Sequence, residues 1–343
     1  MKLDLTGHVV MPGLINAHDH LEFNLFPRLG DGPYANASEW ARDIYHPDRS
    51  PVREQVAVPK RVRLWWGALK NLLSGVTTVC HHNPYEPKVF GREFPVRVVR
   101  RFAWAHSVEF ERDLGKRLRT RKADAPFVIH CGEGTDDDAR RELETLDRLG
   151  GLDPRTVLVH GVALTPRCLA LLHRRQAALV WCPTSNVAML GRTVSRNVLR
   201  SGLPIALATD SALSAPVDLL DELVVARRYL SASRLFEMVT AEPAHILRLR
   251  PTADWIAVRS KRRTPAEALL DGTVAAVVSR GRLRLISPEL ARQIPRDRLR
   301  KFQPLEVEGR PKVLVDANVS GLRRSAAKHL GSELRLAGKR VLG

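Results

Sequence analysis

The chain has 343 residues, of which 44% are hydrophobic and 27% are charged, and its formal net charge is +18 at pH 7. This composition excludes a disordered or fibrous protein, and the length suits one α/β barrel of roughly 250 residues with an appendage. We find no apolar run of the roughly 18 residues that a membrane span needs and no signal segment at the start. We therefore expect a cytoplasmic protein that does not enter a membrane.

The excess of positive charge has two interpretations. Clustered Lys and Arg favour a polyanionic partner such as nucleic acid. Here Arg greatly outnumbers Lys, and the basic residues are spread over separate segments, among them 60–70, 97–102 and 258–263. The sequence also has no zinc knuckle, RNA-recognition signature or glycine-rich phosphate loop. We therefore expect a small-molecule substrate and no nucleic-acid partner.

Short apolar runs that end in polar residues recur along the chain. Amphipathic segments such as 137–150 and 165–175 separate them, and this alternation predicts βαβ units and a parallel sheet. In such a sheet the carboxyl ends of the strands line the ligand site. The runs are HVVMPGLINAHDH (8–20), GVTTVCHH (75–82), VRVVRRFAWAH (96–106), APFVIHCGE (125–133), RTVLVHG (155–161), AALVWCP (177–183) and PIALATD (204–210).

The pattern changes after a predicted closing helix at 237–249. Segments 253–260 and 273–287 resemble antiparallel strands, and the tail from 311 predicts a strand, a helix and another strand. We predict an α/β fold, a (β/α)8 TIM-like barrel that is regular or distorted, with a small partial β-sandwich from the chain termini. The predicted domains are the barrel at 9–250, the partial sandwich at 1–8 and 251–310, and a basic C-terminal extension at 311–343.

Histidines and one aspartate lie at the ends of four of these runs. His18 and His20 alternate with Asp19, so on an extended chain both imidazoles face the same side. An isolated pair of this kind would be two exposed or capping histidines. His130, His160 and Asp210 end later runs, however, and three imidazoles with one carboxylate suit Zn²⁺ or Fe²⁺. An ion held in this way lowers the pKa of bound water to roughly 7.

These motifs resemble the amidohydrolase superfamily, in its branch of cyclic deaminases and chlorohydrolase-like enzymes. The resemblance covers about residues 7–249. It rests on VMPGLINAHDH for the first barrel strand, HCGEG for the fifth, LVHG for the sixth, CPTSN for the seventh and ATDSAL for the eighth. The segment that begins ADWIAV is similar to strands of the family's small β-sandwich.

The resemblance implies roles for individual residues. His18, His20, His130 and Asp210 would bind one divalent metal ion, with Zn²⁺ expected and Fe²⁺ as the alternative. His160 would contact the substrate and could also reach the metal. Glu133 would shuttle protons, as the acid that serves the leaving nitrogen, while Asp210 acts as the base. The alternative for Glu133 is a surface glutamate at the start of a helix.

Further candidates for substrate binding are His82, His106, Asn186 and Glu22. Asn186 could instead cap a turn, and no motif of the family requires His82 or His106. The long insert at 21–55 is rich in aromatic, Gly and Pro residues. We expect it to form a lid over the metal, with Glu22, Asn24, Tyr34 or Trp40 selecting the substrate; otherwise it packs outside the barrel.

The sequence departs from the family pattern in two places. Only the ten residues MKLDLTGHVV precede the segment MPGL, which begins at Met11, so we expect either a misplaced start or an incomplete sandwich. Between segments 75–82 and 125–130 we identify one strand where a barrel needs two. Either the second lies within 92–110 or the barrel is compressed.

The predicted function is metal-dependent hydrolysis of non-peptide carbon–nitrogen bonds, by a deaminase or an amidohydrolase. One alternative is hydrolysis of lactones or esters on the same barrel, because the same hydroxide attacks any polarised carbonyl. Another is a non-catalytic member that binds polyanions. A homodimer is compatible with the family but follows from no motif.

Overall fold

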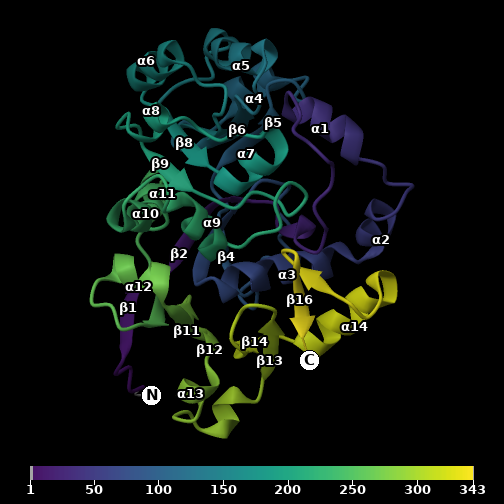
Figure 1. Cartoon of the computed structure of the whole chain (residues 1–343), viewed down its shortest axis with the longest axis vertical. Helices are drawn as coiled ribbons and strands as arrows, with labels where there is room; N and C mark the ends of the chain where they lie inside the picture. Colours follow the sequence, from purple (N-terminus) through teal and green to yellow (C-terminus); the bar gives the residue numbers. More distant parts are fainter. Residues whose placement is uncertain (1–2, 343) are drawn as a thin grey trace.

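The computed structural model describes residues 3–342 and has a mixed α/β architecture (Figure 1). Its parallel strands lie in a three-stranded sheet, β2-β3-β4, and a five-stranded sheet, β5-β6-β7-β8-β9, so the strands follow one another in chain order. These strands are β2 (Leu14–Asp19), β3 (Val76–His81), β4 (Arg97–Val98), β5 (Ala103–Ser107), β6 (Phe127–Cys131), β7 (Thr156–His160), β8 (Ala178–Trp181) and β9 (Ile205–Leu207). Parallel pairing in chain order places all their carboxyl ends on one side.

The first and last parallel strands meet at the site end. The backbone N–H of Asp210, three residues after β9, donates to the carbonyl of His18 at 3.2 Å. In contrast, β4 and β5 are not paired by backbone hydrogen bonds. The side chain of His82, just after β3, donates to the carbonyl of Ala105 in β5 at 2.9 Å and so links the two sheets. The chain therefore brings its amino-terminal histidine pair beside the strand that precedes Asp210.

The region 92–110, in which the sequence could not locate the second strand, contains both β4 and β5. The strand β4 has only two residues and pairs with Thr78 and Val79 of β3. A strand this short carries no period-two pattern, which is why one of the two strands could not be located from the sequence.

Helices connect and cover these strands. They are α1 (Ala37–Ile44), α2 (Val52–Ala57), α3 (Lys60–Leu73), α4 (Leu114–Thr120), α5 (Asp137–Arg148), α6 (Pro166–Arg175), α7 (Pro183–Leu190), α8 (Arg196–Leu199), α9 (Leu219–Ala226), α10 (Ala232–Met238) and α11 (Ala241–Ile246), with the short 3₁₀ turn η1 (Leu21–Phe23). None of the helices within residues 3–342 combines the length and apolar character needed to cross a membrane.

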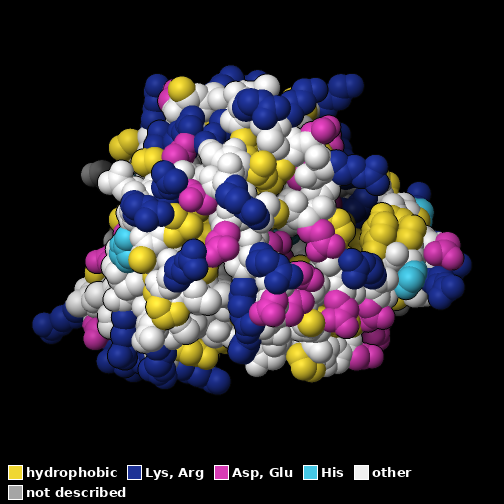
Figure 2. Space-filling model, turned by 90° about the horizontal axis from the view of Figure 1, so that it is seen from above, with side chains coloured by type: hydrophobic (Ala, Val, Ile, Leu, Met, Phe, Trp, Pro, Cys, Tyr) yellow, Lys and Arg dark blue, Asp and Glu magenta, His cyan; other side chains and the backbone are white. Residues whose placement is uncertain are grey.

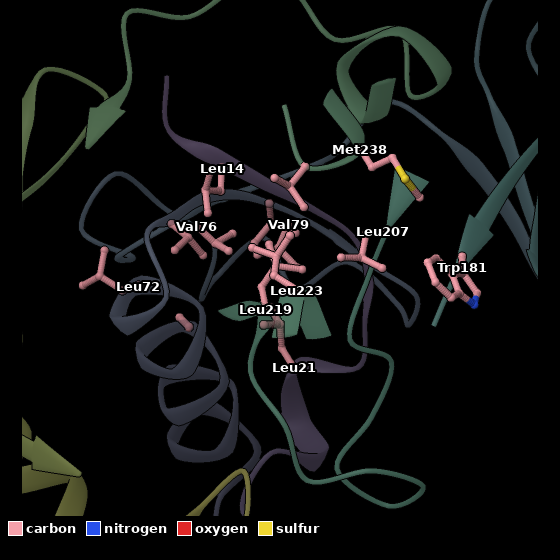
Figure 3. Packing of buried hydrophobic residues seen from close by; sticks show 14 of the residues in the cluster. Leu14, Leu21, Leu72, Val76, Val79, Trp181, Leu207, Leu219, Leu223 and Met238 are labelled. Carbon is pink, nitrogen blue, oxygen red and sulfur yellow. The ribbon is translucent and has the colours of Figure 1, made fainter. Parts of the chain in front are cut away.

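The core around the first strands fixes the turn that follows His20. In Figure 3, Leu72 of α3 lies beside Leu14 and Val76, and Leu219 and Leu223 of α9 lie near Val79. At Gly67, a Cβ atom would stand 2.1 Å from the carbonyl oxygen of Leu21. Only glycine permits this close approach of α3 to the turn after His20.

An antiparallel sheet joins the two ends of the chain in the lower half of Figure 1. Its eight strands have the order β1-β10-β11-β12-β14-β13-β16-β15. They are β1 (His8–Pro12), β10 (Trp255–Arg259), β11 (Thr273–Ser279), β12 (Arg282–Ile286), β13 (Phe302–Val307), β14 (Val313–Asp316), β15 (Arg335–Leu336) and β16 (Lys339–Leu342). The remaining elements of this part are α12 (Pro265–Asp271), α13 (Pro288–Ala291), α14 (Val319–Leu330) and the 3₁₀ turn η2 (Arg296–Leu299).

The predicted antiparallel strands at 253–260 and 273–287 are present. The second segment forms the hairpin β11–β12, whose two turn residues, Arg280 and Gly281, have φ of 53° and 70°. Positive φ at both central residues is the geometry of tight hairpin turns. The tail predicted as strand, helix and strand contains β14, α14, β15 and β16, and its strands extend the same sheet.

The basic side chains are dispersed over the surface. On the face in Figure 2, Lys and Arg lie scattered among acidic and uncharged residues rather than in one patch. Many pair with carboxylates, as in Arg175 with Asp147 at 2.8 Å and Arg259 with Glu289 at 2.7 Å. The four cysteines are buried and unpaired.

Candidate active site

Three histidines and one aspartate from distant parts of the chain converge at the carboxyl ends of the strands. One ligand atom from each of His18, His130, His160 and Asp210 lies within 4.8 Å of the other three, and all four residues are buried. His18 is on β2, His130 on β6 and His160 ends β7, while Asp210 follows β9. His160 and Asp210 have φ of 77° and 60°, a strained conformation that is concentrated at functional sites.

This donor set fits a divalent transition metal ion. The Nε2 atoms of His18 and His130 are 3.1 Å apart, and His18 Nε2 lies 3.3 Å from Asp210 Oδ1. Burial lowers the pKa of His18 to about 4, and that of His130 well below its ordinary value, so both imidazoles are neutral at pH 7. Neutral imidazoles and one carboxylate are the ligands that Zn²⁺ commonly takes in proteins.

His20, the second histidine of the motif, lies next to this group. Its Nε2 is 3.5 Å from Asp210 Oδ1, and its Nδ1 donates to Asn83 Oδ1 at 2.5 Å. The hydrogen bond leaves the lone pair of Nε2 on the side of Asp210. Asn83 in turn donates to Glu22 at 3.0 Å, so Glu22 orients His20 through Asn83, as outer partners of ligand histidines do.

The two candidate proton-transfer carboxylates have opposite electrostatic environments. Burial raises the pKa of Glu133 well above its usual range, and the nearby Asp210 and Glu142 add to the shift. Burial would also raise the pKa of Asp210, but its hydrogen bond with His18 and the charges of His160, His18 and His20 outweigh burial, so that pKa lies well below the usual range. The two neighbouring carboxyl groups therefore have opposed pKa shifts, the pattern that lets one carboxyl act as an acid and the other as a base.

His160 links Glu133 to the seventh-strand motif. Its Nδ1 donates to Asn186 Oδ1 at 2.8 Å, and its Nε2 is 3.1 Å from Glu133 Oε1. Asn186 is buried and also donates to Thr193 at 3.3 Å. The asparagine thus fixes the tautomer of His160 instead of lining the cavity described below.

The other predicted histidines surround His130. The ring of His82 stacks on His130 with centroids 4.6 Å apart and an interplanar angle of 13°. His106 meets the same ring edge-on at 5.0 Å and lines the open cavity. His82 is buried, with its Nε2 bonded to the carbonyl of Ala105, so of these two it is His106 that reaches the space in front of the site.

A cavity of about 610 Å³ opens in front of these residues. Its walls carry aromatic and apolar side chains from α1 and its surroundings, together with His20, His130, Glu133, His160 and Asp210. The apolar and aromatic lining residues include Phe23, Trp40, Ile44, Tyr45, Phe110 and Leu213. The insert that was predicted to be a lid therefore contributes the wall of the cavity.

Other residues proposed from the insert lie elsewhere. Tyr34 bonds through its hydroxyl to Asp43, and Asn24 donates to Asp19 Oδ1 at 3.0 Å behind the site. Neither is among the residues that line the cavity, in contrast to Trp40.

Two serines at Asp210 were not identified from the sequence. Ser185 and Ser214 donate to Asp210 Oδ2 at 2.7 and 3.0 Å. These bonds hold one carboxylate oxygen while the other faces the histidines. Ser185 lies inside the CPTSN motif, so that motif was the available signal for its proximity to the site, whereas Ser214 stands in no motif.

An acidic side chamber of about 350 Å³ adjoins the cavity and shares His106, Phe110, His130 and Glu133 with it. Glu109, Asp138 and Glu142 add carboxylates to its wall. Burial raises the pKa of Glu142 to about 7, although the N–H of Gly132 donates to its Oε2 at 2.6 Å and opposes this shift.

We expect Glu142→Gln to change how stability depends on pH. Because the pKa of Glu142 is raised in the folded protein, its favourable contribution is complete below the unfolded value of 4.5 and is lost as the pH rises through about 7. The melting temperature of the wild type should therefore fall more between about pH 5 and about pH 8 than that of the variant. Thermal unfolding at both pH values tests this. Glu144→Gln, on the exposed face of α5, is the control and should behave as wild type.

Comparison with known proteins agrees with the site and the fold. A sequence profile described as the Amidohydrolase family matches residues 91–261. A 5-methylthioadenosine/S-adenosylhomocysteine deaminase of Thermococcus sibiricus is 26% identical over 311 residues, covering 72% of this chain and 71% of that enzyme. One from Syntrophobacter fumaroxidans is 28% identical over 305 residues, covering 73% and 67%.

Solved structures show the same fold. An adenosine deaminase from Xanthomonas campestris with bound zinc superposes with a TM-score of 0.63 at 18% identity, over 94% of this chain and 85% of that one. Atrazine chlorohydrolase of Arthrobacter aurescens, as a mutant complexed with zinc and atraton, gives 0.67 at 15% identity, over 94% and 88%. The site is that of a metal-dependent hydrolase, and the chain belongs to the amidohydrolase family.

Proposed function

We propose that this protein is a metal-dependent deaminase that hydrolyses the exocyclic C–N bond of a 6-aminopurine nucleoside with an uncharged or thioether-bearing 5′ substituent. The observation that carries the proposal is the pair of carboxyl groups with opposed pKa shifts, Glu133 and Asp210. They lie at the end of the cavity, at the group formed by His18, His130, His160 and Asp210, called the four-donor group below. Two similar sequences, both of 5-methylthioadenosine/S-adenosylhomocysteine deaminases, support the substrate class.

The ligands we propose for the ion are His18, His20, His130 and Asp210, with His160 near enough to reach it. A divalent ion, Zn²⁺ in the first instance, would supply Lewis acidity that makes a water molecule a better nucleophile. His160 would otherwise hydrogen-bond the substrate, as its position beside Glu133 and at the cavity wall allows.

The protein's own residues account for the proton transfers. As water adds to C6 of the purine, Asp210 accepts a proton from the water and neutral Glu133 gives its proton to ring N1. Asp210 then passes its proton to the amino group, and Glu133 takes the proton of the new hydroxyl. The C6–N6 bond breaks, ammonia leaves, a 6-oxopurine remains, and both carboxyl groups return to their starting states.

We further propose that the two parallel sheets are parts of one distorted (β/α)8 barrel, interrupted between β4 and β5, with the antiparallel sheet as the partial sandwich. Chain-order pairing and the bond from Asp210 N to His18 O support this arrangement. In this division the barrel covers residues 13–250 rather than 9–250, because β1 (His8–Pro12) pairs with β10 in the antiparallel sheet. Residues 3–12 and 251–310 form the sandwich, and residues 311–342 are an extension that adds strands to it.

The test is ammonia release by zinc-loaded protein. The substrates are 5′-methylthioadenosine, S-adenosylhomocysteine, adenosine, guanine and an ester with a similar apolar body. We expect ammonia and a 6-oxopurine from at least one 6-aminopurine nucleoside. Turnover of the ester alone, or of none of the compounds, would refute the proposal.

Trp40 should contribute to substrate affinity. It lies on α1 at the cavity wall, where an aromatic ring can pack on the purine or its substituent. We expect Trp40→Ala to lose about 1 kcal/mol of substrate-binding free energy and to raise KM roughly fivefold. The value of kcat should change little, because the lost contact is made equally in the bound ground state and in the transition state. Steady-state kinetics test this, and Tyr34→Phe, on the same insert but outside the cavity, should match wild type.

A further inference from the structure

A fully buried ion pair lies behind the four-donor group, on the side of β2 opposite the histidines. Lys70 of α3 is 2% exposed and Asp19 is 0% exposed. The ammonium Nζ of Lys70 is 2.8 Å from Asp19 Oδ2. Asp19 stands between His18 and His20, and because side chains alternate along β2, it points away from them into the space beneath α3.

Lys70 also reaches the last parallel strand. Its Nζ donates to Thr209 Oγ1 at 3.1 Å, and Thr209 immediately precedes Asp210. One ammonium therefore contacts the residue between the two histidines and the residue before the aspartate. These positions lie at the end of β2 and in the segment after β9, which the hydrogen bond from Asp210 N to His18 O also joins.

Amides complete the network around this ion pair. Asn71 donates to Asp19 Oδ2 at 2.6 Å, and Asn16 donates to Thr209 Oγ1 and to Asn71 Oδ1, each at 2.9 Å. The backbone N–H of Thr209 donates to Asn16 Oδ1 at 3.3 Å. All of these side chains are buried. A buried polar network in which the charges are paired and bonded specifies one arrangement of the strands that meet there.

We propose that Lys70 is a positioning residue: through Asp19 and Thr209 it locks the ends of β2 and β9 in register, so that His18, His20 and Asp210 keep their common geometry. This inference rests on the proposed function, because it assumes that these residues hold the ion. A buried ion pair is a poor source of net stability compared with apolar residues of similar volume. Its location, directly behind the donors of two strands, points to positioning.

The decisive variant is the double substitution Asp19→Asn with Lys70→Met. Lys70→Met alone leaves a buried, uncompensated carboxylate and is expected to destabilise the fold strongly. The double variant removes both charges together, so we expect it to fold. We also expect its Kd for Co²⁺ or Zn²⁺ to rise roughly tenfold to a hundredfold, the usual cost of losing an outer partner, and its visible Co²⁺ spectrum to change.

Control variants separate positioning from general stability. Arg284→Met with Asp316→Asn removes another ion pair, 3.0 Å long, between the buried Arg284 and the partly buried Asp316 of the antiparallel sheet. It should lower the melting temperature and leave the Co²⁺ affinity and spectrum as in wild type. Thr209→Val keeps the Lys70–Asp19 pair and removes the hydroxyl that accepts from both Lys70 and Asn16 beside Asp210, and it should also weaken Co²⁺ binding.

A folded double variant with wild-type Co²⁺ affinity and spectrum would overturn the proposal. If the double variant does not fold, Thr209→Val decides: unchanged metal binding would contradict the proposal. If wild type itself binds no Co²⁺ or Zn²⁺, the proposed function fails instead. The two failures are therefore distinguishable.

Discussion

Glu133→Gln should lower kcat by about 10³-fold while the bound metal and KM change little. Burial and the neighbouring carboxylates raise the pKa of Glu133 well above its usual range, which favours the protonated form that the proposed transfer to ring N1 needs. A glutamine has nearly the same shape but can neither give up nor recover that proton. General acid–base catalysis typically contributes 10²–10⁴-fold. Steady-state ammonia release, with metal content measured on the same samples, tests the expectation.

The matched control for Glu133→Gln is Glu144→Gln, the same chemical change on the exposed face of α5. It should retain wild-type kcat. If Glu133→Gln kept more than about one tenth of the wild-type kcat, an effect below the range of general acid–base catalysis, Glu133 would not be the proton carrier. A loss of metal in this variant would instead place Glu133 among the residues that hold the ion.

Metal removal should abolish activity and lower the melting temperature. The four-donor group is preformed in the folded chain, and its buried donors come together only on folding, so the ion binds the folded state preferentially. Free ion at about 100 times its Kd stabilises the folded state by about 2.7 kcal/mol. Thermal unfolding and ammonia release, measured before chelation, after it and after zinc is restored, test this.

His130→Ala provides the control for the chelation experiment. This variant lacks one donor of the group, so chelator should change its melting temperature much less than that of wild type. Full activity of the chelated wild type, or an equal shift in both proteins, would contradict a metal bound at this group.

The sequence predicted the site better than it predicted the framework behind it. His18, His130, His160 and Asp210 each end an apolar run, and parallel strands place such ends together, so their convergence followed from pattern alone. The strand β10 and the helix α14 were likewise predicted from local patterns, whereas segment 273–287, expected as one strand, forms the hairpin β11–β12.

Contacts between distant residues carry no local pattern and could not be predicted. The two residues of β4 are recognisable as a strand only through their pairing with β3. Lys70 stands in an ordinary amphipathic helix, and only the fold brings it to Asp19 and Thr209. Glu22 was expected at the substrate, yet its bond to Asn83 places it behind His20.

For a similar reason, the sequence could not predict which strands extend the antiparallel sheet. Strands β13, β14 and β16 come from the last part of the chain, and the tail was expected to be a separate extension. Their shared sheet depends on which edges remain free after β1, β10, β11 and β12 have paired, and edge availability is a property of the whole fold.

The central claim is that distant donors share one divalent ion. Crystals grown with zinc, measured at the zinc absorption edge, test it most directly through anomalous difference density. We predict one strong peak about 2.0–2.2 Å from the Nε2 atoms of His18 and His130 and from a carboxylate oxygen of Asp210. A map without a peak there, or with zinc bound only elsewhere on the chain, would contradict the account.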